Sequence, residues 1–156
     1  MRRLFIYLII TVLSANCVGQ DKTITLDLQQ IEFKDKALIN TLSDLSKQKP
    51  DCFNENDYYI LDFFYSSLSN EEYYLSINQF VADNNTPITI AYYVIVDGIV
   101  YFISNKVSTD VIKVLPSKKR YSFKNGNGIN VGGDYYFLIW RTRMGYYHVL
   151  LSTCCE

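Results

Sequence analysis

Two apolar runs joined by an Asp-Gly dipeptide constrain the fold more than any other feature of this sequence. Residues 88–96 and 99–103 are rich in β-branched and aromatic side chains, and only Asp97 and Gly98 separate them. Such a link favours a type I′ β-hairpin, because both turn residues must take positive φ. Since both faces of the hairpin are apolar, we expect it at the centre of a sheet that is covered on both sides. The predicted pairs are Val96 with Ile99, Val94 with Tyr101, Tyr92 with Ile103, and Tyr93 with Phe102.

Period-two alternation and aromatic enrichment predict further strands. These strands cover residues 23–28, 58–65, 111–115, 135–140 and 146–152. The last two are expected to form a second hairpin that turns through residues 141–145. The Gly/Asn-rich residues 125–134 are expected to form a loop before it, and the basic triplet 118–120 a solvated turn.

One segment has a clear helical period. Leu38, Leu42 and Leu45 recur at intervals of four and three residues within 34–47, where most other positions are polar. This spacing predicts an amphipathic helix that packs on an apolar surface. The helix is expected to end at Pro50, because the residue before a proline disfavours helical backbone.

The segment 70–82 fits two templates. Ser69 and Glu72 have the spacing of a capping box, and apolar residues follow at helical intervals. Alternation around Leu75 suggests a strand instead, but it fails at Gln79. We therefore expect a second helix here.

The N-terminus has the order of a secretory signal peptide. Two arginines precede the uncharged run 4–13, and small and polar residues follow. The run is shorter than the roughly 18 residues that a membrane-spanning helix needs. Cleavage before Gln20 is favoured. The alternative is lipoprotein processing at Cys17, although Asn16 stands where a lipobox usually has a smaller residue.

The chain is therefore expected to be exported, as a periplasmic, cell-surface or secreted protein. Contact with the membrane is expected only through a lipid anchor at Cys17. Residues 1–19 then form the signal peptide, and residues 20–156 form one domain, since no linker divides them. The predicted fold class is α+β: a mainly antiparallel sheet of five to seven strands with one or two helices packed on one face.

The four cysteines are Cys17, Cys52, Cys154 and Cys155. An exported protein can form disulfides, and three cysteines remain once Cys17 is cleaved off or lipidated. We predict a disulfide between Cys52 and either Cys154 or Cys155, which would pin the C-terminus onto the domain. The alternative is that all three thiols are unpaired. No zinc site is predicted, because the sequence has no CxxC pair.

Composition and motifs argue against several functions. The formal net charge of −1 lacks the basic footprint that nucleic acid requires. His148 is the only histidine, and no nucleophile-elbow or phosphate-loop motif is present. We therefore predict no nucleic-acid partner, no cofactor, no metal and no enzymatic activity. A small hydrolase that uses His148 is the least favoured alternative.

Tyrosine doublets are the remaining unusual feature. They occur at residues 58–59, 73–74, 92–93, 135–136 and 146–147. In a strand, each doublet sends one ring to each face of the sheet. Tyrosine could serve here only as a large β-former, or it could form a contact surface, since it is favoured at interfaces.

The function predicted from the sequence is that of a small exported binding protein, for example an inhibitor or an immunity-type protein. Its partner is expected to be another protein. The predicted contact surface consists of Tyr135, Arg143, Tyr146 and Tyr147. The alternative function is that of a structural or envelope-assembly lipoprotein.

Overall fold

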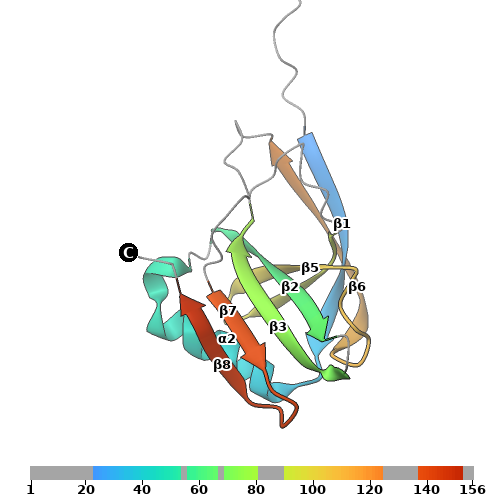
Figure 1. Cartoon of the computed structure of the whole chain (residues 1–156). Helices are drawn as coiled ribbons and strands as arrows, with labels where there is room; N and C mark the ends of the chain where they lie inside the picture. The colour runs from blue at the N-terminus through green and yellow to red at the C-terminus, as the bar shows by residue number, and fades with distance from the viewer. Residues whose placement is uncertain (1–22, 54–55, 67–68, 81–89, 125–136, 153–156) are drawn as a thin grey trace, which may run out of the picture.

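The computed structural model of the chain describes residues 23–53, 56–66, 69–80, 90–124 and 137–152 (Figure 1). These residues form an eight-stranded sheet, one α-helix and one short 3-10 helix. The strands are β1 (Thr23–Phe33), β2 (Tyr58–Ser66), β3 (Ser69–Gln79), β4 (Ile90–Val96), β5 (Ile99–Ser104), β6 (Ile112–Lys124), β7 (Phe137–Arg141) and β8 (Tyr147–Ser152). The α-helix is α2 (Lys36–Gln48), and the 3-10 helix is η1 (Pro50–Cys52). The strand order is β6-β1-β4-β5-β2-β3-β7-β8.

The Asp-Gly hairpin is confirmed in the middle of this sheet. Asp97 and Gly98 have φ values of 49° and 84°, and β4 pairs with β5 in the predicted register. Tyr93 is buried in a cluster on one face of the sheet, and Val94 is buried in the main core on the other. The hairpin is therefore covered on both sides, as its apolar pattern predicts.

The sheet is larger than the predicted five to seven strands, and it is mixed rather than mainly antiparallel. β1 runs parallel to β4, and β2 runs parallel to β5, while the other neighbours are antiparallel. In each parallel pair, at least two other elements lie between the two strands in the sequence. Two parallel strands must be joined by a long crossover connection. Whether two strands pair in parallel therefore depends on how the intervening elements pack, and no short sequence pattern predicts it.

The helix expected over 70–82 is wrong, because Ser69–Gln79 forms strand β3. Leu75 and Ile77 point into the main core and are completely buried. Gln79, where the alternation fails, is simply the last residue of the strand. Pairing with β2 on one side and β7 on the other outweighs the local helical spacing.

The basic triplet at 118–120 lies in an edge strand, so the predicted turn is also wrong. β6 runs well beyond the expected end at residue 115. Arg120 lies opposite Asp27 of β1, and its Nε donates a hydrogen bond to Asp27 Oδ1 over 2.7 Å. Two side chains of opposite charge that face each other on neighbouring strands stabilise the pairing of those strands, so charged residues can be part of a sheet.

Helix α2 confirms the predicted amphipathic helix. Leu38, Leu42 and Leu45 are buried on its inner side. The helix contacts β1, β4 and β8, and β1 and β8 lie near opposite ends of the strand order. The sheet must therefore curl around the helix, which crosses it behind β7 and β8 (Figure 1). The main core fills the concave side.

The convex face of the sheet is only partly covered. Leu28 and Ile31 lie on opposite faces of β1 by the ordinary alternation of a strand, so Leu28 faces the convex side and Ile31 faces the main core. The outer half of the β1–β6 pair folds over this face, and Tyr121 of β6 contacts Tyr58 of β2 with ring centroids 5.5 Å apart. Among the described residues, this second cluster draws none from β3, β7 or β8. Within the described chain, this cluster leaves Tyr74 of β3 partly exposed on the convex face, although Ser76 of the same strand is buried.

Three tyrosine doublets divide between the two faces as predicted. Tyr59 and Tyr73 are buried in the main core, whereas Tyr58 and Tyr74 point to the convex side. In the third doublet, Tyr93 is buried in the second cluster and cannot serve as a contact residue.

Candidate binding site: an aromatic row on the open sheet face

Four rings form a line across the open part of the convex face. Phe64, Tyr74, Trp140 and His148 lie directly opposite one another on β2, β3, β7 and β8. The ring centroids of Tyr74 and Trp140 are 6.5 Å apart, and those of Trp140 and His148 are 5.9 Å apart. Phe64 and Tyr74 are 48% and 42% exposed. We call these four residues the aromatic row. Large apolar side chains that gather on an exposed surface are typical of interaction sites.

Glu72 fixes the position of the indole ring. One oxygen of its carboxylate accepts a 3.2 Å hydrogen bond from Trp140 Nε1, and the other accepts a 3.1 Å bond from Arg143 Nε. Glu72 is on β3, two residues before Tyr74, so its side chain shares the convex face. The carboxylate therefore ties the β7–β8 turn to the aromatic row.

A polar pair lies beside the row on the same face. Asp62 of β2 is directly opposite Ser76 of β3. Burial raises the pKa of Asp62 above its usual range, and the nearby positive charge of Lys106 only partly opposes this. Ser76 is completely buried, and its Oγ has no hydrogen-bond partner in the described part of the chain. The row is thus flanked by a carboxyl group and a hydroxyl group.

The predicted contact surface is only partly assembled. Arg143 and Tyr146 both lie exposed in the turn between β7 and β8, next to the aromatic row. Tyr135 lies outside the described residues. Tyr147 points to the opposite, concave face, because it alternates with His148 along β8. Of the predicted contact residues in the described chain, Arg143 and Tyr146 therefore lie beside the aromatic row, and Tyr147 lies on the other face of the sheet.

Tyr147 belongs to a polar network at the start of α2. Its hydroxyl donates a 2.9 Å hydrogen bond to Asp35 Oδ2 and lies 2.7 Å from the hydroxyl of Tyr73. Arg141 Nε also donates to Asp35 Oδ2, over 3.3 Å. Burial raises the pKa of Tyr73 to about 12, although the hydrogen bond with Tyr147 opposes this shift. Asp35 also caps the helix, through a 2.9 Å bond from Ala37 N to its Oδ1.

Cys52 is buried and takes part in a disulfide bond. Cys154 and Cys155 lie outside the described residues, so the pairing of Cys52 with either of them stays a prediction. Cys17 and the rest of the predicted signal peptide also lie outside that part of the chain.

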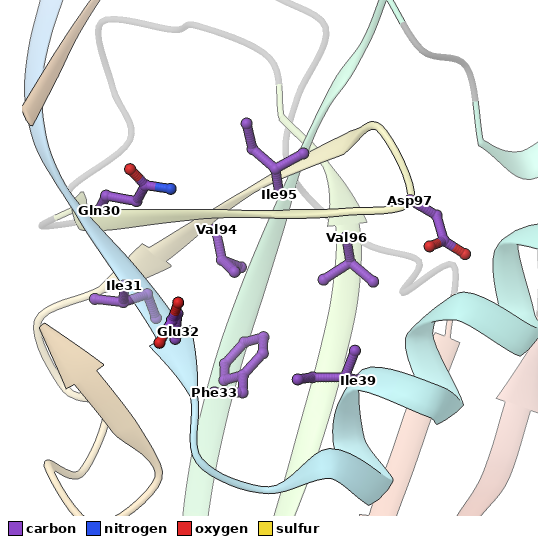
Figure 2. Close-up of a pocket in the computed structure, with 9 residues that line it drawn as sticks. All are labelled: Gln30, Ile31, Glu32, Phe33, Ile39, Val94, Ile95, Val96 and Asp97. Carbon is purple, nitrogen blue, oxygen red and sulfur yellow. The ribbon is translucent and has the colours of Figure 1, made fainter. Parts of the chain in front are cut away.

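A cavity of about 330 Å³ opens where β1 and β4 diverge beyond their short parallel contact (Figure 2). Its apolar wall includes Phe33, Ile39 and Val96, which point toward one another in Figure 2. Asp97 at its rim forms a 3.2 Å ion pair with Lys47 of α2. The cavity is thus an apolar hollow lined by two carboxylates, Glu32 and Asp97, of which Asp97 is paired with Lys47.

The described residues include no cluster of histidine, cysteine or acidic side chains that could hold a metal ion. Within them, no helix is long and apolar enough to cross a membrane. The arrangement on the convex face suits non-covalent recognition, because its rings offer contact area and its polar groups offer direction.

Sequence reasoning missed Phe64, Tyr74, Trp140 and Glu72 as site residues. They come from three strands, and only the strand register brings them into one line. The doublet at 73–74 was the one signal available, because it required that one of its two rings leave the core.

The chain matches no protein-family model, and neither a curated protein nor a solved structure shows significant similarity to it.

Proposed function

We propose that this chain is an exported, non-catalytic binding protein that holds another protein on its aromatic row. The observation that carries this proposal is the direct opposition of four rings across four neighbouring strands, with Phe64 and Tyr74 both more than two-fifths exposed.

The row is rigid before any partner arrives. Backbone pairing fixes the strands, and the Glu72 carboxylate holds both Trp140 and Arg143. A surface that is already ordered loses little conformational entropy on binding, so more of the contact energy appears as affinity. Tyrosine, tryptophan and arginine are also the residue types that dominate binding energy in protein interfaces.

The charge of the site favours a protein partner over a nucleic acid. The formal net charge is −1, and Glu72 and Asp62 place two carboxyl groups on the same face as the row. Of the cations near this face, Arg143 is paired with Glu72, and the charge of Lys106 acts on Asp62. A phosphate backbone would therefore meet little free positive charge here.

The test is affinity capture from the native envelope and medium, with the wild-type protein and three variants as bait. Tyr74→Ala and Trp140→Ala remove rings from the row, while Val114→Ala removes an exposed side chain from β6, at the far edge of the sheet. We expect one stoichiometric protein partner with the wild type and with Val114→Ala. Each ring variant should weaken binding by at least about 30-fold, the size of an interface hot spot.

Trp140 is the only tryptophan, so its fluorescence reports directly on the row when the purified partner is titrated in. Capture that is equal in all variants, with unchanged fluorescence, would refute the proposal. The alternative function predicts a different result: no soluble partner, and a mass increase of one diacylglycerol at Cys17, as in an envelope-assembly lipoprotein.

A further inference from the structure

The two edges of the sheet differ in how they are protected. β6 forms one edge and β8 the other (Figure 1). β6 contains Pro116 and five basic residues, and such residues are the usual protection against pairing with another strand. β8 has the sequence YHVLLS, without proline and without a charged side chain, and its one irregularity is a register shift that leaves Leu150 without a direct partner on β7. No strand of the described chain pairs with its outer side.

The backbone of β8 has free hydrogen-bonding positions at this edge. Thr142 N donates to Tyr146 O over 2.9 Å, which makes these two residues a hydrogen-bonded pair across the turn. Hydrogen-bonded and non-bonded pairs alternate in an antiparallel ladder. The N–H and C=O groups of Tyr147 and Val149 therefore point away from β7, toward the open edge.

Exposed apolar side chains gather at the same place. Val149 is 46% exposed, and Tyr146 and Leu150 are each more than half exposed. These three residues lie within five consecutive positions centred on His148. A short edge with outward backbone groups and exposed apolar side chains is the surface that strand addition requires.

We propose that β8 pairs antiparallel with β8 of a second copy of this chain, with the two-fold axis at His148. The outward groups of Tyr147 then pair with those of Val149 of the other copy, and the reverse pair is equivalent. His148 faces its own counterpart, and the shared ladder covers residues 147–149, since the register shift of β8 displaces Leu150. The aromatic row then continues across the axis into the row of the second copy.

The pattern of residues favours a second copy over an unrelated strand. The axis at His148 sets the exposed Val149 of one copy opposite Tyr147 of the other. No like charges meet, since residues 146–150 include no lysine, arginine or acid. The same pairing at β6 would bring basic residues together, and like charges directly opposite are destabilising.

Sedimentation of the exported, oxidised protein over a range of concentrations tests this pairing. Val149→Lys places a charge at the proposed contact. Val114→Lys is a matched control, because Val114 is 49% exposed on the opposite edge strand. We expect a reversible dimer for the wild type and for Val114→Lys. Val149→Lys should weaken the dimer by at least about tenfold.

A second measurement tests the register and does not depend on the lysine variants. In a non-hydrogen-bonded pair the Cα atoms are about 4.5 Å apart, which permits a disulfide. We expect His148→Cys to form a 148–148 link under mild oxidation, identified by peptide mapping, and Leu150→Cys to form no link to itself. A wild-type protein that stays monomeric, or a self-link at residue 150 but not at 148, would overturn the proposal.

Discussion

Asp35 connects the start of α2 to the β7–β8 hairpin, so its removal should destabilise the whole domain. One carboxylate oxygen accepts from Ala37 N and caps the helix. The other accepts from Arg141 Nε and from the hydroxyl of Tyr147. Asp35→Ala removes all three interactions, whereas Asp35→Asn keeps an oxygen for the cap and loses the charge.

The size of the effect follows from these partners. Loss of a helix N-cap costs about 1 kcal/mol. The Asp35 and Arg141 side chains are 26% and 21% exposed, so their hydrogen bond is largely shielded from water, and a charged bond of that kind contributes about 2 kcal/mol. We expect Asp35→Ala to lower the free energy of unfolding by about 3 kcal/mol, and Asp35→Asn by about 2 kcal/mol.

Urea titration followed by Trp140 fluorescence measures this loss, because the chain has one tryptophan. With an m value of roughly 1.5 kcal/mol/M, Asp35→Ala should lower the midpoint by about 2 M. Asp44→Ala, an exposed position in the same helix, serves as the control and should change stability by less than about 0.5 kcal/mol. The reasoning fails if Asp35→Ala and Asp44→Ala have the same midpoint.

Two further predictions concern buried hydroxyl groups. The raised pKa of Tyr73, about 12, means that above pH 10 the unfolded chain loses this proton before the folded chain does. Stability should therefore fall between pH 10 and 12, by about 3 kcal/mol for this residue, and Tyr73→Phe should flatten that fall in urea titrations at increasing pH. Ser76→Ala removes a buried Oγ that lacks a partner among the described residues, so it should leave stability unchanged or raise it by up to about 1 kcal/mol. Ser104→Ala is its comparison in thermal unfolding, because Ser104 Oγ accepts a hydrogen bond from Lys106 N; a larger loss for Ser76→Ala than for Ser104→Ala would contradict this explanation.

Local patterns predicted those parts of the fold whose neighbours are close in sequence. The Asp97-Gly98 turn fixed the β4–β5 register, because a two-residue turn leaves one way to pair outward. The leucines of α2 needed only helical spacing to identify the buried side. The same approach failed for β3, where short-range spacing favoured a helix and pairing with two distant strands decided for a strand.

Only part of the candidate site could be read from the sequence. Arg143 and Tyr146 lie in the turn beside the aromatic row, but Tyr147 faces the helix instead. The doublet at 73–74 indicated only that one of its rings leaves the core, and Phe64 gave no signal, because an exposed aromatic residue and a buried one look alike within a strand. Burial on one face depends on what covers that face, and here the β1–β6 pair covers the convex side only as far as β2.

The sequence by itself determined the central hairpin, the amphipathic helix, and the division of the tyrosine doublets at 58–59, 73–74 and 92–93 between two faces. Each of these follows from turn chemistry or from the period of side chains along one element. The tertiary structure alone decided the parallel pairs, the curl of the sheet around α2 and the line of rings on its open face. Those features depend on contacts between residues that are far apart in the chain. Such contacts are favourable only when the folded domain brings the two surfaces together and removes them from water.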